Sequence, residues 1–97
     1  MERSDLKREV VSYITDMAEE LALERVVLFG PRARGDFSDK SDIDLAVRGQ
    51  RVRAYAALLE EECPTLLSFD VIDLSDDIAD PLRKRIETEG VILYEQV

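Results

Sequence analysis

The chain has 97 residues and a mass of 11.0 kDa, and 45 % of its residues are apolar. This length supports one core, so we expect residues 1–97 to form a single domain. The 22 acidic residues outnumber the 13 basic residues and give a formal charge of −9. That charge argues against direct nucleic-acid binding, which requires lysine and arginine in excess.

The apolar segments are short, and the charged N-terminus does not resemble a signal peptide. None approaches the roughly 20 residues that span a bilayer, so we expect a cytoplasmic protein without a membrane segment. The chain has no histidine and one cysteine, Cys63. These counts exclude an internal disulfide, a Cys/His zinc site and a Ser–His or Cys–His nucleophile pair. Catalysis would therefore depend on carboxylates, a metal that they hold, or cationic side chains.

Hydrophobic spacing predicts helices and strands in alternation along the chain. In chain order these are a helix over 4–22, a strand over 25–29, a turn-rich segment over 31–40 and a strand over 42–47. A helix over 50–62, a strand over 66–74, a helix over 76–89 and a strand over 91–95 follow. This order predicts a two-layer α/β fold with the helices packed on one face of a sheet.

The strand over 42–47 carries two carboxylates on one face. Alternate residues of a strand point to opposite faces, so Asp42, Asp44 and Ala46 share one face and the residues between them are wholly apolar. The acidic face must be open, because two close carboxylates cannot be buried unpaired. Their Cα atoms lie about 7 Å apart by strand rise. Carboxylates at this spacing can bind hard cations such as Mg²⁺ or Mn²⁺.

The strand over 66–74 supplies a third acid. Its alternation places Asp70 on the same open side as the first pair, and places Asp73 at the end of the covered side. Three carboxylates on adjacent strands suit metal-assisted phosphoryl transfer, in which the third binds metal or accepts the proton of the nucleophile. We favour Asp70 as this third acid, with Asp73 as the alternative.

The turn between Gly30 and Gly35 is a candidate phosphate site. Its backbone amides can cradle phosphate, and Arg32 and Arg34 place positive charge beside it. Ser41 can contact phosphate or cap the turn. The alternative is structural: the glycines make a tight turn, and the arginines are solvated surface charges.

Gly30 is followed by one residue, then by ten further residues and then by Asp42-Ile43-Asp44. This spacing resembles the nucleotidyltransferase signature of the DNA polymerase beta superfamily. Segments 29–36, 41–47, 69–74 and 89–94 are similar to the minimal nucleotidyltransferases, or MNT proteins. The resemblance extends over essentially the whole chain. It implies a mixed sheet of about four strands with an open acidic face.

The same resemblance implies functional roles. Asp42 and Asp44 would bind Mg²⁺ and Asp70 would be the third carboxylate, while the turn at Gly30 would hold the triphosphate of ATP. MNT proteins are commonly paired with a small helical HEPN protein, often an RNase toxin, in a hetero-oligomer. In such pairs the MNT member is the antitoxin, and some transfer AMP to a tyrosine of the toxin.

Position 31 departs from the signature, which normally has serine there. Pro31 offers neither a hydroxyl nor a backbone N–H to a phosphate. We therefore expect an Mg²⁺-dependent enzyme that transfers AMP to a hydroxyl of a partner protein. The alternative is a catalytically weakened binding module that neutralises a HEPN-type partner by masking its surface. Transfer to a small molecule or an RNA end is a third interpretation, which the acidic composition disfavours.

Overall fold

The computed structural model describes residues 6–35, 42–63, 65 and 67–96. Its elements follow in the order α1 (Arg8–Glu20), β1 (Arg25–Phe29), α2 (Pro31–Arg34), β2 (Ile43–Arg48), α3 (Val52–Glu62), β3 (Phe69–Asp73), α4 (Asp80–Glu89) and β4 (Val91–Glu95). Within these residues, every helix is too short or too polar to cross a membrane.

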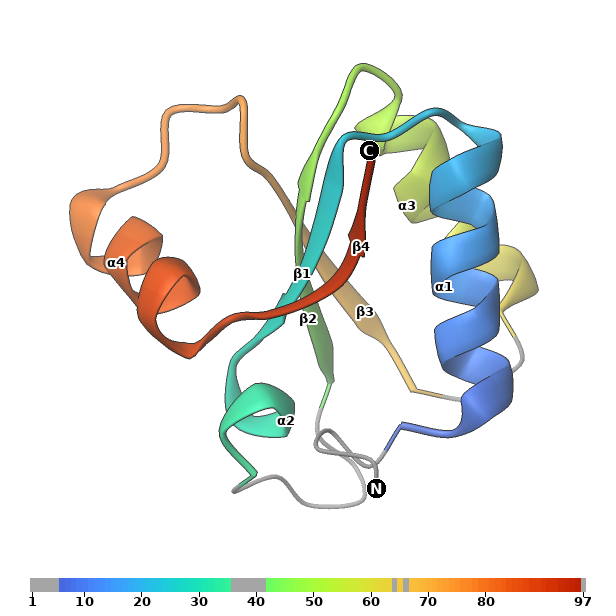
Figure 1. The fold of residues 1–97 in the computed structure, drawn as a ribbon, viewed down its shortest axis with the longest axis horizontal. Helices are drawn as coiled ribbons and strands as arrows, with labels where there is room; N and C mark the ends of the chain where they lie inside the picture. The colour runs from blue at the N-terminus through green and yellow to red at the C-terminus, as the bar shows by residue number, and fades with distance from the viewer. Residues whose placement is uncertain (1–5, 36–41, 64, 66, 97) are drawn as a thin grey trace.

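The four strands form one mixed sheet in the order β3-β2-β1-β4 (Figure 1). Strand β1 pairs antiparallel with both β2 and β4, whereas β2 pairs parallel with β3. The parallel pair requires a crossover, which α3 provides. The predicted mixed α/β sheet is therefore confirmed.

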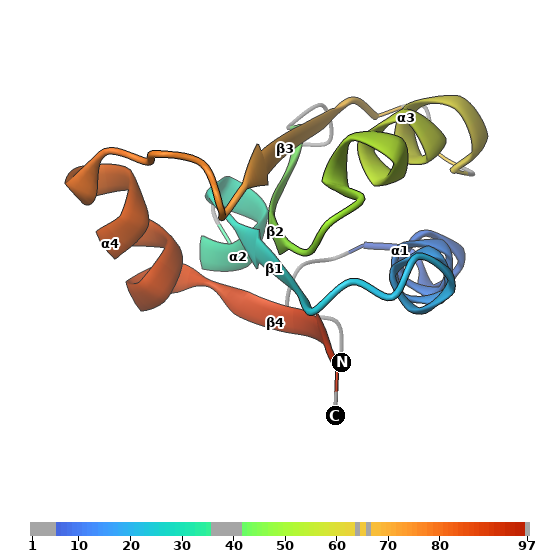
Figure 2. The ribbon, with the colours of Figure 1, turned by 90° about the horizontal axis from the view of Figure 1, so that it is seen from above.

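Helices α1 and α3 cover one face of the sheet (Figure 2). The predicted apolar side of β2 lies under them, since Ile43, Leu45 and Val47 are fully buried. Tyr55 of α3 is also fully buried, and its hydroxyl donates a hydrogen bond of 2.8 Å to the carbonyl oxygen of Ile14. This bond joins the two helices and satisfies the polar group that burial would otherwise leave unpaired.

Helix α4 lies on the opposite face, which corrects the expectation that all helices pack on one side (Figure 2). Its Ile86 packs with Val27, Phe29 and Ala46, and Ala46 is fully buried rather than open. The reason is in β1, whose residues 26–29 are apolar on both faces. A strand apolar on both faces requires cover on both. The second face is therefore partly covered by α4.

Several element bounds differ from the prediction, and two of the differences concern the surroundings of the candidate site. Residues 31–34 form a short helix where a turn was expected, with Pro31 in its first position. Proline suits that position because its fixed φ is helical and its missing N–H has no partner inside the helix. Helix α4 begins at Asp80 instead of residue 76. Before it, Asp73 closes a turn by accepting hydrogen bonds from the backbone N–H and the hydroxyl of Ser75, at 2.9 and 2.6 Å.

Candidate functional site

The register of the parallel strands places two predicted site residues side by side. Asp44 of β2 is the direct partner of Asp70 of β3. Neighbouring strands lie about 4.8 Å apart, and partner residues in a parallel pair point to the same face. Asp42 precedes Asp44 by two positions and is exposed beside them. The three carboxylates predicted from strand alternation therefore gather at one edge of the open face.

The alternative third acid, Asp73, lies elsewhere. Its partner in the register is Val47, and its carboxylate is engaged by Ser75 in the turn that follows β3. These hydrogen bonds lower the pKa of Asp73 below its ordinary value. Asp73 is thus a turn-forming residue at the opposite end of the strand from Asp70.

Gly30 lies directly beneath the Asp44 carboxylate. A Cβ atom built on Gly30 would collide with Oδ2 of Asp44 and lie 3.2 Å from its Cγ. Gly30 also has a φ of +78°, in the region that favours glycine. The strand register explains this approach, because Phe29, the residue before Gly30, is the partner of Asp44. The turn that is predicted to bind phosphate therefore lies against one of the predicted carboxylates.

Helix α2 starts from that glycine. The backbone N–H groups of Ala33 and Arg34 donate hydrogen bonds of 3.0 and 3.1 Å to the carbonyl oxygen of Gly30. These amides are therefore engaged within the turn and are not aimed outward. Pro31 contributes no N–H at all. The amide donors available to a phosphate here are consequently fewer than the sequence predicts.

The two arginines of α2 have different surroundings. Arg32 is buried, with 3 % of its surface exposed, so its interpretation as a solvated surface charge was wrong. Arg34 is partly exposed, and its Nη1 donates a hydrogen bond of 3.0 Å to Oε1 of Glu89 on α4. Phosphate contact by either residue stays a prediction. Ser41 lies outside the described residues.

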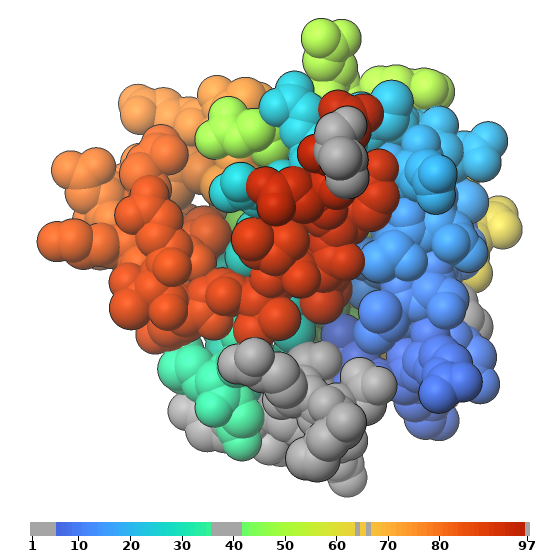
Figure 3. All heavy atoms as spheres, viewed as in Figure 1, coloured from blue at the N-terminus to red at the C-terminus, as the bar shows by residue number. Residues whose placement is uncertain are grey.

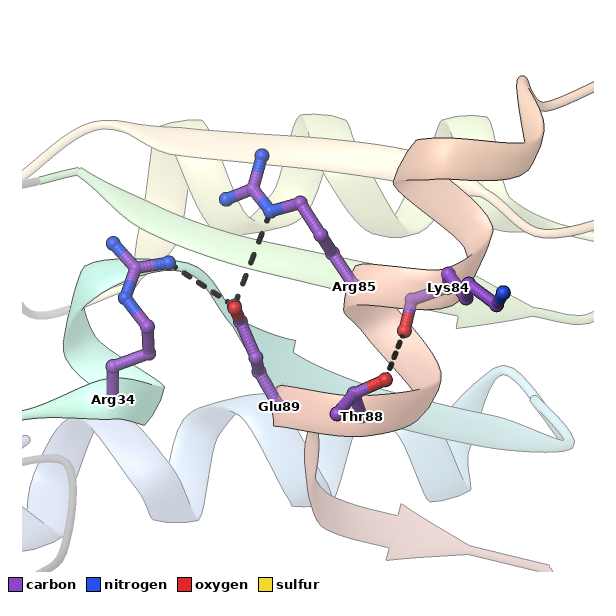
Figure 4. A network of polar contacts seen from close by, with 5 residues as sticks. All are labelled: Arg34, Lys84, Arg85, Thr88 and Glu89. Carbon is purple, nitrogen blue, oxygen red and sulfur yellow. Dashed lines mark hydrogen bonds and ion pairs between the residues drawn. The ribbon is translucent and has the colours of Figure 1, made fainter.

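Glu89 lies between Arg34 and Arg85 (Figure 4), two arginines whose charges act on Asp44. Nε of Arg85 lies 4.0 Å from the same Oε1 atom that accepts the bond from Arg34. Neither Arg85 nor Glu89 is among the site residues predicted from the sequence. The spacing of four residues between them was a visible helical signal. Their approach to α2 could not be predicted from this spacing, because it depends on which face of the sheet α4 covers.

The electrostatics of Asp44 reflect this neighbourhood. Partial burial is the largest cause that raises its pKa above the ordinary value, and the charges of Asp70 and Asp42 raise it further. Arg85 and Arg34 act in the opposite direction. The net effect is a raised pKa of Asp44, and a cation bound here would offset the part of it that comes from the two neighbouring acids.

The donor chemistry fits a hard divalent cation. Carboxylate oxygens are the ligands that Mg²⁺ and Mn²⁺ prefer, and Mg²⁺ is usually held by one or two carboxylates together with phosphates of the substrate. Across the part of the chain that the structure describes, no three acidic or thiol side chains form a ready-made metal cluster. Asp42 and Asp44 are thus the candidate pair, with a substrate phosphate needed to complete the coordination.

Known structures share this architecture at low sequence identity. A variant of the MntA-HpeT toxin-antitoxin is 20 % identical, with a TM-score of 0.68 over 89 % of this chain and 73 % of that one. A toxin-antitoxin structure with AMP-PNP is 21 % identical, with a TM-score of 0.69 over 93 % and 75 %. Another MntA-HpeT variant gives 21 % identity and a TM-score of 0.66 over 95 % and 75 %. These likenesses show the fold.

The family is shown by sequence. No curated protein sequence matches the chain significantly. The family described as "Polymerase beta, Nucleotidyltransferase", however, matches residues 12–97, which include Gly30 and all three site carboxylates. The fold, the signature spacing and this match agree: the chain belongs to the polymerase beta nucleotidyltransferase family.

Proposed function

We propose that this protein is a Mg²⁺-dependent nucleotidyltransferase that transfers AMP from ATP to a hydroxyl of a partner protein. The observation that carries the proposal is the placement of Asp44 against Gly30 and beside Asp70. This arrangement would bring a triphosphate on the turn next to carboxylates that bind cations.

The partner we infer is a HEPN-type toxin, with this chain as its antitoxin in a hetero-oligomer. Support comes from structural neighbours that are described as toxin-antitoxin proteins, one of them with AMP-PNP. The acidic charge of −9 suits a basic protein partner. ATP as substrate and Mg²⁺ as cofactor agree with the predicted cytoplasmic location.

In the proposed reaction, Asp42 and Asp44 would hold Mg²⁺ or Mn²⁺, which neutralises phosphate charge and favours an ionised nucleophile. The acceptor oxygen would attack the α-phosphorus of ATP and form a new P–O bond. The bond from that phosphorus to the bridging oxygen of the β-phosphate breaks, and pyrophosphate leaves. Asp70, which lies on the same face, would accept the proton of the acceptor hydroxyl or complete the cation site.

Cationic side chains near the turn would bind the triphosphate. Arg34 and Arg85 are held together by Glu89 and are close enough to Asp44 to influence its pKa. Charge-assisted hydrogen bonds from guanidinium groups would compensate in part for the donors that Pro31 lacks. Positioning and charge stabilisation would then account for most of the catalysis.

Intact-mass spectrometry tests the proposal. The product of the neighbouring gene is incubated with this protein, ATP and Mg²⁺, in parallel with Asp42→Asn/Asp44→Asn. We expect mass increases of whole AMP units on the partner with the native protein and none with the variant. Equal modification by the variant would show that these carboxylates are not needed for the reaction.

The second candidate function is neutralisation by masking, without chemistry. Pro31 favours it, because the position lacks both hydrogen-bond donors that serine would offer to a phosphate. A stable complex that silences the partner equally well with Asp42→Asn/Asp44→Asn, and no mass increase, would support masking. Loss of neutralisation with that variant would support AMP transfer.

A further inference from the structure

Strand β3 forms one edge of the sheet, and its outer side has open backbone groups. The carbonyl oxygen of Ser68 accepts a hydrogen bond of 2.9 Å from Ile43 of β2, whereas the N–H of Phe69 donates one of 3.1 Å to Oε2 of Glu60 on α3. Backbone groups of alternate residues point to opposite edges of a strand, so Val71, like Phe69, directs its N–H and C=O away from β2. Within the part of the chain that the structure describes, nothing pairs with Val71 on that side.

We propose that an extended, basic segment of the partner protein adds to this edge as a further strand, antiparallel to β3, with a hydroxyl side chain beside Asp70. The inference rests on the proposed function in one respect: it names how the acceptor hydroxyl would reach the site. Strand addition itself requires neither ATP nor transfer, so the two can be tested separately.

The accessibility of β3 carries the first part of the argument. None of its five residues is buried, whereas four of the six residues of β2 are. Figure 2 shows β3 at one margin of the sheet and β4 at the other. An open edge presents unpaired donors and acceptors that another chain can bond, and addition of an extended peptide to such an edge is a recurring mode of recognition.

The direction of the backbone at Asp70 carries the second part. Ser68 bonds to β2, so Asp70, two residues on, also directs its backbone groups toward β2. A residue opposite Asp70 on an antiparallel segment would form a non-hydrogen-bonded pair with it, with Cα atoms about 4.5 Å apart. The two side chains would point to the same face, on which Asp44 also lies. A hydroxyl at that position would stand next to the carboxylate that we propose as its proton acceptor.

The charges along the edge carry the third part. Glu60 lies at the start of β3 and Asp70 in its first half, while Arg48 acts on Asp73 at the far end. Arg53 lies seven residues, or about two turns, before Glu60 on α3. Even with it counted, acids exceed arginines among the described groups near the edge and the site, which favours a basic segment. The acids are Asp42, Asp44, Glu60, Asp70, Asp73 and Glu89, and the arginines are Arg34, Arg48, Arg53 and Arg85.

The other edge of the sheet is too far from the carboxylates for this role. Strand β4 forms the red surface in the middle of Figure 3. Two strands separate it from β3, so a segment added there would begin about 14 Å from Asp70, which is three strand spacings. The edge of β3 is therefore the one that can bring a hydroxyl to the site.

The first test measures binding of a defined peptide without nucleotide or metal. The probe is a fluorescein-labelled octapeptide of alternating lysine and valine in which serine replaces a central lysine. A second probe is the same peptide with two adjacent central residues N-methylated, which keeps the charge and blocks pairing on both of its edges. A third has glutamate in place of lysine. Anisotropy should show saturable binding of the first probe and about tenfold weaker binding of the other two, from lost hydrogen bonds and charge repulsion respectively.

Each probe comparison can overturn one part of the proposal. Equal binding of the first and second probes would reject strand addition in favour of attraction between charges alone. Equal binding of the first and third would reject the basic character of the segment. Absence of saturable binding by the first probe would reject the site altogether.

The second test changes the protein at the edge. Val71→Pro removes an N–H that faces away from β2, a position where edge strands tolerate proline. Val71→Ala is the matched control, because it shortens the same side chain and keeps the N–H. The first probe should bind Val71→Pro about tenfold more weakly and Val71→Ala within about twofold of native. Equal binding to the two variants would overturn the proposal. Thermal unfolding checks that both are folded, and the probe comparison on the native protein decides if Val71→Pro is not.

The third test measures transfer to the partner. Val71→Pro should raise the KM for the partner about tenfold relative to Val71→Ala, while the KM for ATP stays within about twofold. An unchanged KM for the partner would overturn strand addition and leave the proposed transfer intact. Conversely, edge-dependent probe binding without any AMP transfer by the native protein would retain strand addition and reject the proposed enzyme.

Discussion

Asp44 of β2 and Asp70 of β3 are direct partners in the parallel register, and both point to the open face of the sheet. Two carboxylates on adjacent strands repel each other, and this repulsion contributes to the raised pKa of Asp44. Such an arrangement costs stability in the metal-free protein. It is useful where a cation binds, because the same charges then become ligands.

The substitution Asp44→Asn should therefore raise the stability of the metal-free protein while it lowers the activity. We expect AMP transfer to fall at least 100-fold, because stabilisation by a bound metal is worth several kcal/mol. The melting temperature of the metal-free protein should rise, since the like charge next to Asp70 is removed. Differential scanning fluorimetry with and without Mg²⁺ checks this: Mg²⁺ should stabilise the native protein and not the variant. Equal stabilisation of both would place the cation elsewhere.

The raised pKa of Asp44 predicts how stability depends on pH. A carboxyl whose pKa is higher in the folded state binds more protons there than in the unfolded chain. Its contribution to stability is therefore present at low pH and is lost as pH rises through the folded pKa. Between about pH 4 and pH 7, the metal-free native protein should lose stability relative to Asp44→Asn. Urea unfolding of both proteins measures this difference, and a constant difference across the range would contradict it.

Gly30→Ala should damage both the fold and the site. The new methyl group would meet the Asp44 carboxylate and force alanine into a positive φ. We expect a loss of about 1–3 kcal/mol in the free energy of unfolding, together with loss of AMP transfer. Gly35→Ala is the matched control, because Gly35 also has a positive φ and open space around it. It should lose about 1 kcal/mol, the cost of backbone conformation alone. Equal losses would show that the contact with Asp44 is unimportant.

Pro31→Ser tests whether the departure from the signature weakens the enzyme. Each hydrogen bond to a charged phosphate is worth about 1.5–3 kcal/mol. Serine should therefore raise the affinity for a non-hydrolysable ATP analogue at least tenfold, with little change in unfolding free energy. Isothermal titration calorimetry in the presence of Mg²⁺ measures the affinity. Unchanged affinity would show that the site binds triphosphate without this position.

Arg85→Ala tests the assignment of Arg85 to the nucleotide site. Removing a cation beside the triphosphate should raise the KM for ATP about tenfold, from the loss of one charge-assisted hydrogen bond. Lys84→Ala is the matched control, since it removes the same charge and Lys84 points away from Arg34 and Glu89 (Figure 4). The stability of both variants should change by less than about 1 kcal/mol, because exposed ion pairs contribute little. An equal KM for the two variants would reject the assignment.

The sequence by itself predicted the mixed sheet and the three carboxylates of the candidate site. Strand alternation is local, so the parity of Asp42, Asp44 and Asp70 could be predicted before any strand pairing was known. The residues that alternate with these acids along each strand are apolar and required burial under helices. That requirement placed the acids on the other face of the sheet. The glycine spacing that resembles the nucleotidyltransferase signature located the turn, and the family match agrees with it.

Tertiary structure alone decided which groups surround those acids. An amphipathic helix specifies which of its sides is buried, but not which face of a sheet it covers, so the position of α4 could not be read from its own pattern. Its packing on Ala46 brings Arg85 and Glu89 to α2. The contact between Gly30 and Asp44 likewise depends on strand register, a long-range property that the residues of one strand do not encode.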